Sequence, residues 1–127
     1  MQMSPLRRHD VWLPPLALMA AIFFLSAQPS LDSGLGVLDL IGRKLLHFAI
    51  YALLCFLWWR AFATVLGSGR AAVAALLVAS AYAVTDEFHQ SFVEGRSGTV
   101  LDWAIDTAGA ALAAMRLRSR RRERVAA

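Results

Sequence analysis

The chain has 127 residues, 58% of them hydrophobic, and a formal net charge of +4 at pH 7. This length suits one domain, and the apolar fraction is too high for an ordinary soluble domain. The apolar residues form four blocks that approach or exceed the roughly 17–25 residues needed to span a bilayer. The blocks are Val11–Ala27, Leu45–Leu66, Ala71–Val84 with a continuation to Phe92, and Val100–Leu117. The sequence therefore predicts an all-α integral membrane bundle of four transmembrane helices.

The first block resembles a signal peptide, because basic residues precede an apolar run. No clear small-residue cleavage site follows that run, however. Pro14 and Pro15 lie near its start, and the first turn of a helix tolerates proline. We therefore interpret this block as a retained first helix.

The basic residues are unevenly distributed, since six of the twelve arginines lie in Arg116–Arg124. A basic tail can bind nucleic acid, but basic residues beside membrane helices more commonly mark the cytoplasmic side and attract anionic lipids. We therefore predict cytoplasmic N and C termini and no nucleic-acid partner. We divide the chain into a transmembrane domain over residues 1–118 and a basic cytoplasmic tail over residues 119–127, mobile or bound to the membrane surface.

This topology leaves two outer loops, Pro29–Arg43 and Val93–Thr99, and gathers the unusual polar residues at the outer face. Ionised groups within apolar helices are costly and commonly functional. We therefore expect these residues to cluster at one end of the bundle. They are Ser26, Gln28, Lys44, His47, Tyr51, Asp86, Glu87, His89, Gln90, Arg96, Asp102 and Asp106.

Within three of the blocks, the polar residues recur at helical spacing and so share one helix face. The repeats are Lys44–His47–Tyr51, Glu87–Gln90 and Asp102–Asp106–Gly109–Ala113. The last repeat joins carboxylates to small residues, which let membrane helices approach closely. We therefore predict that the fourth helix packs inward on this stripe.

Lys44 is the single lysine of the chain, a compact point charge among arginines.

An ordered set of motifs carries a family resemblance. The motifs are Lys44-x-x-His47-Phe48-x-x-Tyr51-x-x-Leu54, Asp86-Glu87-x-x-Gln90-x-Phe92-x-x-Gly95-Arg96 and Asp102-x-x-x-Asp106-x-x-Gly109. Together with Ser26-x-Gln28, they resemble the VanZ-like family over the region from Phe23 to Ala113. The resemblance implies a small multi-pass protein of the bacterial inner membrane, in a family linked through its founding member to low-level teicoplanin resistance. The family usually has asparagine at the position of Asp106, so this carboxylate is a departure that could change ligand preference.

The leading functional hypothesis is a periplasm-facing site for an anionic envelope lipid or headgroup, with a contribution to cell-envelope tolerance of glycopeptide antibiotics. Membrane lipids are the expected partners, and lipid-linked cell-wall intermediates are candidates among them. Arginine can grip a phosphate through two hydrogen bonds. The expected ligand-binding residues are Lys44, Tyr51, Asp86, Gln90, Arg96 and Asp102.

The sequence leaves open whether the protein is an enzyme. An alternative function is hydrolysis or transfer of a lipid phosphate, with His47 as nucleophile or general base oriented by Glu87 or Asp86. Asp106 completes the expected catalytic set. The carboxylates could instead hold Mg²⁺ against a phosphate, but no known metal motif is present, so we assign no metal site and identify no cofactor.

Two further alternatives use the same residues. A structural network of ion pairs could join the helices without binding a ligand. Intramembrane carboxylates also serve as proton or ion relays, although the cytoplasmic half of the chain has no matching polar residues. The sequence does not determine the oligomeric state, and an oligomer is one of the alternatives.

Overall fold

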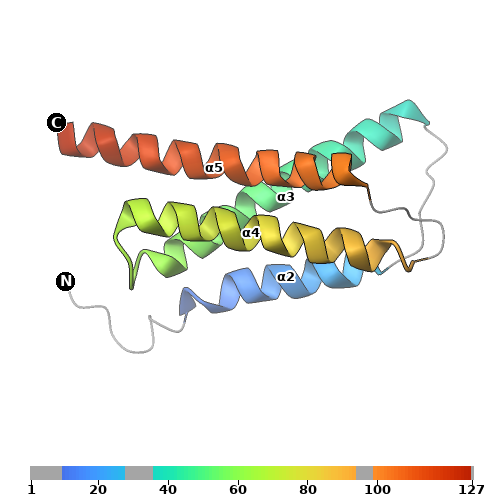
Figure 1. Ribbon diagram of the computed structural model, residues 1–127, viewed down its shortest axis with the longest axis horizontal. Helices are drawn as coiled ribbons and strands as arrows, with labels where there is room; N and C mark the ends of the chain where they lie inside the picture. Colours follow the sequence, from blue (N-terminus) through green and yellow to red (C-terminus); the bar gives the residue numbers. More distant parts are fainter. Residues whose placement is uncertain (1–9, 28–35, 94–98, 127) are drawn as a thin grey trace.

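The computed structural model describes residues 10–27, 36–93 and 99–126, and within these ranges it contains four α-helices and no strand. The helices are α2 (Leu13–Ser26), α3 (Val37–Phe62), α4 (Ser68–Gln90) and α5 (Val100–Ala126). Successive helices run in alternating directions along the long axis of the molecule (Figure 1). The predicted all-α fold is confirmed.

Two of the helices are long and apolar enough to cross a membrane, α3 with 26 residues and α4 with 23. At 1.5 Å per residue they measure about 39 and 35 Å, against a hydrocarbon core of about 30 Å. The apolar helix α2 has only 14 residues, or about 21 Å, and α5 carries aspartates near its start and arginines toward its end. Two spans are therefore supported by length and composition, while four spans and the orientation of the termini stay predictions.

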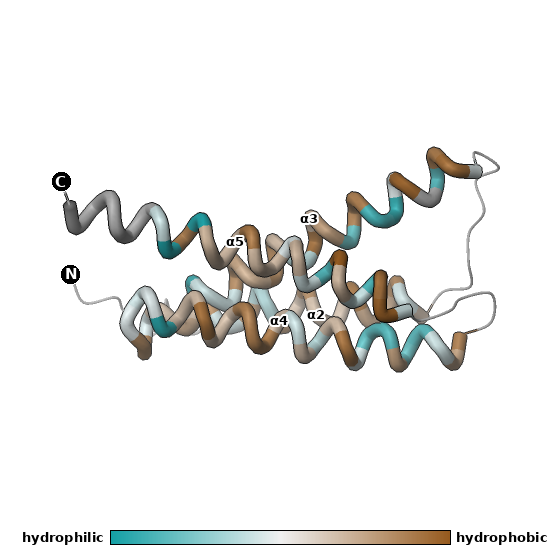
Figure 2. The backbone as a smooth tube through the Cα atoms, turned by 45° about the horizontal axis from the view of Figure 1, so that its top comes forward, coloured by the Kyte–Doolittle hydropathy of each residue, from teal (hydrophilic) through white to brown (hydrophobic). Residues whose placement is uncertain are grey.

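Large apolar side chains are exposed on all four described helices. Examples are Phe24 on α2 (65% exposed), Leu77 and Phe88 on α4 (65% and 67%) and Met115 on α5 (67%). Apolar residues accordingly occur along all four helices in Figure 2. Soluble monomers rarely expose apolar surface on this scale, so the surface agrees with a lipid environment.

Helix α3 begins at Val37, eight residues before the predicted block at Leu45. The prediction that residues up to Arg43 form a loop is therefore wrong for Val37–Arg43. The charged residues in this stretch lower its hydropathy without breaking the helix. Arg43 instead pairs with Asp39 one turn earlier, at 2.9 Å, and pairs at this spacing stabilise helices.

Helix α5 continues through the basic segment as far as Ala126. Arginine has a high helix propensity, so the change from apolar to basic residues does not end the helix. The predicted boundary at residue 118 is thus a change of composition within one helix.

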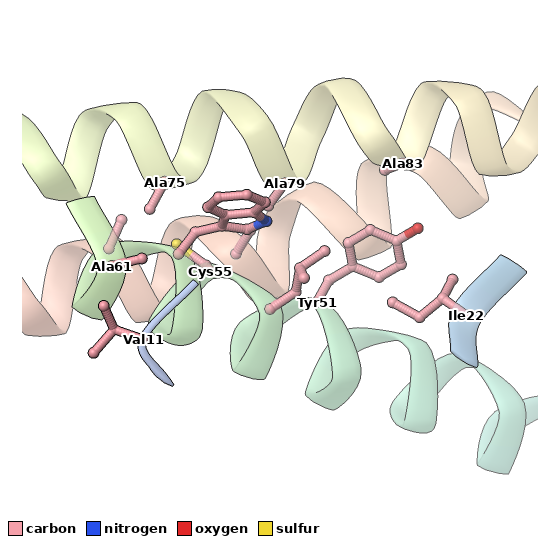
Figure 3. Close-up of a cluster of buried hydrophobic side chains, with 12 residues drawn as sticks. Val11, Ile22, Tyr51, Cys55, Ala61, Ala75, Ala79 and Ala83 are labelled. Carbon is pink, nitrogen blue, oxygen red and sulfur yellow. The ribbon is translucent and has the colours of Figure 1, made fainter. Parts of the chain in front are cut away.

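Alanines form the surface by which α4 packs onto its neighbours. Ala75, Ala79 and Ala83 are fully buried, and they lie along the side of α4 that faces the buried side chains of α3 (Figure 3). On α3, Leu54 and the free thiol of Cys55 are also fully buried. Small side chains allow the close backbone approach on which packing between membrane helices depends.

Helix α5 approaches α3 most tightly at Gly109. A Cβ atom at this position would overlap the main-chain carbonyl of Phe48. Asp106 and Gly109 are buried and Ala113 is half-buried, so the predicted inward-facing stripe is confirmed. The shorter helix α2 packs less extensively on α3 and α4.

We expect Gly109→Ala to lower the free energy of unfolding by about 1–3 kcal/mol, because the added methyl group forces two packed backbones apart. Gly42→Ala on α3 is the control, since a Cβ there meets nothing within 4 Å. It should be neutral or stabilise by about 0.5–1 kcal/mol, because alanine is the better helix former. Thermal unfolding in detergent, followed by circular dichroism, compares the two variants. Equal transition midpoints would contradict the assigned contact.

Candidate functional site at one end of the bundle

The alternating directions of the helices bring distant polar segments to the same end of the molecule. This end combines the last turn of α2, the first half of α3, the last turns of α4 and the first turns of α5 (Figure 1). The buried polar or charged residues of the described chain all lie here: Ser26, Asp86, Glu87, Gln90 and Asp106. Of the predicted site residues, Arg96 lies outside the described residues, as does Gln28 of the family motif.

Lys44 and Asp102 form an ion pair between α3 and α5, with 2.8 Å between Nζ and Oδ1. Both side chains are about one-third exposed, so the pair contributes at most about 1 kcal/mol to stability. The second oxygen of Asp102 accepts a hydrogen bond from the Thr99 hydroxyl at 2.8 Å. The same hydroxyl accepts one from the Asp102 main-chain N–H at 3.2 Å, as in a helix capping box. Asp102 therefore links the start of α5 to α3.

His47 contacts Asp106, with 3.2 Å between Nδ1 and Oδ1. Asp106 is fully buried, whereas the His47 side chain is 31% exposed. The carboxylate in hydrogen-bond contact with His47 is thus Asp106, which the sequence placed in the catalytic set, and not Glu87 or Asp86, which it offered as examples of the orienting group. Helical spacing shows which side chains share a face of one helix, but not which carboxylate of a neighbouring helix lies opposite.

Asp86 lies at the centre of the hydrogen bonds between α3, α4 and α2. Its Oδ2 accepts a hydrogen bond from the Tyr51 hydroxyl at 3.1 Å and a longer one from Gln90 Nε2 at 3.5 Å. Gln90 Nε2 also donates to the Ser26 hydroxyl at 3.3 Å. Tyr51 is only 1% exposed, so it is a core residue that positions Asp86.

Glu87 joins the polar cluster to a groove between α4 and α5. Its Oε2 accepts a hydrogen bond from the Thr99 main-chain N–H at 3.1 Å. The adjoining groove has a volume of about 390 Å³ and a mainly apolar lining. Its lining residues are Val84, Glu87, Phe88, Ser91, Thr99, Val100 and Trp103. The arrangement places an acidic group at the edge of a space that suits a hydrocarbon chain.

Three buried carboxylate oxygens have no hydrogen-bond partner in the described structure: Asp86 Oδ1, Glu87 Oε1 and Asp106 Oδ2. Burying an unpaired polar atom is unfavourable, and burying an unpaired charge is more so. Among the printed contacts, Lys44 pairs with Asp102 and His47 with Asp106. The three unpartnered oxygens suit a hydrogen-bond donor or a cation.

Sequence reasoning missed several residues that support the site. Ser80 and Thr107 join α4 to α5 through their hydroxyls at 3.1 Å, and Trp103 Nε1 donates to the Ser80 carbonyl at 3.2 Å. For Thr99 a signal was available, because a threonine three residues before an aspartate is a helix-start pattern. His89, expected in the polar region, stacks on Phe23 with 4.3 Å between ring centres.

The fold and the polar cluster define a helical membrane protein with a carboxylate-rich site at one end of its bundle. The chain belongs to the VanZ/LLP1 family, whose sequence model matches residues 11–120. The resemblance drawn from the motifs is thereby confirmed. No curated protein and no solved structure matches the chain in the two other comparisons.

We expect Tyr51→Phe to lower the free energy of unfolding by about 1.5–3 kcal/mol, because it removes a hydrogen bond to a buried carboxylate. Tyr82→Phe is the matched control, since its hydroxyl donates to the neutral main-chain carbonyl of Met19. Loss of a hydrogen bond between neutral groups costs about 0.5–1.5 kcal/mol. Unfolding in detergent measures both variants. A larger loss for Tyr82→Phe would contradict the central position assigned to Asp86.

Proposed function

We propose that this protein binds the headgroup of an anionic envelope lipid at the polar end of the bundle, with the lipid tail in the groove between α4 and α5. The observation that carries the proposal is the position of Glu87. This residue lines an apolar groove and also belongs to the carboxylate cluster. A polar site that continues into an apolar groove has the shape of an amphiphile's binding site.

The chemistry of the cluster supports a headgroup with both donors and acceptors. The free oxygens of Asp86 and Glu87 can accept hydrogen bonds from hydroxyl or amino groups. Lys44, and His47 when protonated, are basic groups of the cluster that a phosphate could approach, and both side chains are about one-third exposed. Lipid-linked cell-wall intermediates combine sugar hydroxyls with phosphates, so they belong to this ligand class.

The free oxygens also argue against a purely structural network. A network selected only to join helices would be expected to satisfy its buried atoms, whereas this one leaves an atom free on each of three carboxylates. A relay for protons or ions receives less support, because the buried polar residues of the described chain all lie at one end. We therefore favour a ligand over both alternatives.

The proposal extends to location and physiology. The cluster would face the periplasm from the inner membrane, with both termini in the cytoplasm, because the basic residues would then follow the positive-inside rule. Occupation of the site by an envelope lipid would contribute to tolerance of glycopeptide antibiotics. This extension depends on the resemblance to the teicoplanin-linked family.

We expect delipidated protein in detergent to bind phosphatidylglycerol more tightly than phosphatidylcholine in native mass spectrometry. Lys44→Gln should weaken phosphatidylglycerol binding about fivefold or more, which corresponds to ~1 kcal/mol. Arg60→Gln is the matched control, because it removes a positive charge from an exposed position in the last turn of α3, far from the cluster.

Two outcomes would contradict this proposal. An equal loss in both variants would show that the lipid is attracted by basic surface charge alone. Equal affinity of the wild-type protein for the two lipids would show that the site does not recognise an anionic headgroup.

A second candidate function, lipid-phosphate hydrolysis or transfer, is favoured by the contact between His47 and Asp106. A carboxylate that holds an imidazole in place is the usual arrangement for a histidine that acts as general base or nucleophile. In this scheme His47 Nδ1–H donates to Asp106. As nucleophile, Nε2 bonds to phosphorus while the P–O bond to the lipid alcohol breaks, the alcohol leaves with a proton, and water then releases phosphate from the histidine. As general base, Nε2 instead takes a proton from a water that attacks phosphorus while the same P–O bond breaks. Glu87 at the edge of the groove would contact the headgroup.

For this second candidate we expect purified protein to release phosphate from polyprenyl phosphate or phosphatidic acid, with or without Mg²⁺. His47→Gln should lower the rate by at least about 100-fold, the usual contribution of general acid–base catalysis. Lys44→Gln should affect mainly KM. Absence of turnover by the wild-type protein, under conditions in which it binds lipid, would exclude this candidate and leave lipid binding intact.

A further inference from the structure

Three of the site residues place metal-binding atoms close together. His47, Asp86 and Asp106 each offer one donor atom, and these three atoms lie within 4.8 Å of one another. The residues come from α3, α4 and α5 respectively. One imidazole and two carboxylates thus converge from three helices on one point of the bundle.

Both carboxylates of this group have an oxygen without a hydrogen-bond partner. Asp86 is 3% exposed and Asp106 is fully buried, yet Asp86 Oδ1 and Asp106 Oδ2 have no hydrogen-bond partner in the described structure. Their other oxygens are engaged, by Tyr51 in one case and by His47 in the other. Asp86 is therefore held through one oxygen by residues outside the three donors, and both carboxylates keep a second oxygen available for a ligand. His47 and Asp106 already contact each other, and a bound ion would lie between them.

This pattern is typical of metal sites, where neighbouring side chains orient the ligands through hydrogen bonds. Tyr51 and Gln90 both donate to Asp86 Oδ2, at 3.1 and 3.5 Å. Neither of them reaches Oδ1. Tyr51 and Gln90 thus occupy the positions that outer-shell residues take around a bound ion.

A cation would also relieve the charge repulsion at this point. Two ionised carboxylates repel each other strongly in an apolar interior. Protonated His47 would balance one of them, whereas a divalent ion with neutral His47 balances both. We propose that His47, Asp86 and Asp106 bind one divalent metal ion that accepts mixed oxygen and nitrogen ligands, of the class of Mn²⁺ or Zn²⁺.

Metal binding would draw the three donor atoms closer together. Donors bound at about 2.0–2.2 Å in a tetrahedral site lie about 3.3–3.6 Å apart. The three donor atoms lie within 4.8 Å of one another, so the largest separation would have to shrink by up to about 1–1.5 Å on binding. Three protein ligands leave at least one position open on the ion, as in catalytic zinc sites.

A bound ion would add positive charge to the cluster and so favour an anionic headgroup. This consequence rests on the proposed lipid function, whereas the metal site itself does not. The two proposals therefore fail separately, because metal binding can be measured in the absence of lipid.

The test uses the full chain, purified in detergent without an affinity tag, stripped with chelator and dialysed. Equilibrium dialysis with MnCl₂ or ZnCl₂ should give one ion per chain. Asp106→Asn preserves the size of the side chain and should weaken binding about tenfold or more. Asp102→Asn is the matched control, because it removes the same charge from the same cluster but outside the three donors, and it should weaken binding much less than Asp106→Asn does.

Electron spin echo spectroscopy of bound Mn²⁺ provides a second measurement on the wild-type protein. Imidazole nitrogen coupling should be present and should disappear in His47→Gln. The proposal is overturned if the wild-type protein binds neither ion below about 1 mM, equivalent to ~4 kcal/mol. It is also overturned if Asp102→Asn weakens binding as much as Asp106→Asn, or if the nitrogen coupling is absent or survives His47→Gln.

Discussion

Three carboxylates are buried in an apolar helical bundle, and the helix ends are arranged so that these groups have partners. Asp86, Glu87 and Asp106 are each less than 10% exposed, and an ionised group in such surroundings must have partners. Few partners are available on the same helix, so they come from neighbouring ones. Tyr51 and His47 approach from α3 and the Thr99 main-chain N–H from the start of α5. The polar cluster thereby determines which helix ends lie together.

Close packing makes these contacts possible, and it depends on small side chains. The alanines of α4 and Gly109 of α5 let the helix backbones approach, and Gly109 lies less than one turn from Asp106. Gly109 contacts the carbonyl of Phe48, which is the residue directly after His47 in the sequence. The fold and the site are therefore coupled, because a change in the distance between α3 and α5 also changes the distance between His47 and Asp106.

Much of this arrangement could be predicted from the sequence, since hydropathy and helical spacing are local properties. They gave the helical fold, the inward stripe through Asp106 and Gly109, and the gathering of polar residues at one end. They failed at the start of α3, because the charged residues Asp39 and Arg43 lower the hydropathy of this stretch although they form an ion pair within the helix. They also did not determine the partner of His47, because the rotation of one helix against another depends on packing in three dimensions. The free oxygens of Asp86 and Asp106 could not be predicted for the same reason.

The groove between α4 and α5 has a consequence for how any ligand would reach the cluster. Two of its lining residues, Phe88 and Val100, are 67% and 80% exposed, so in a bilayer this side would be in contact with acyl chains. A hydrophobic ligand would then arrive by lateral diffusion within one leaflet. Occupancy would follow the mole fraction of that ligand among the surrounding lipids, and its concentration in water would have little influence. Such a site would respond to the composition of the membrane in which it lies.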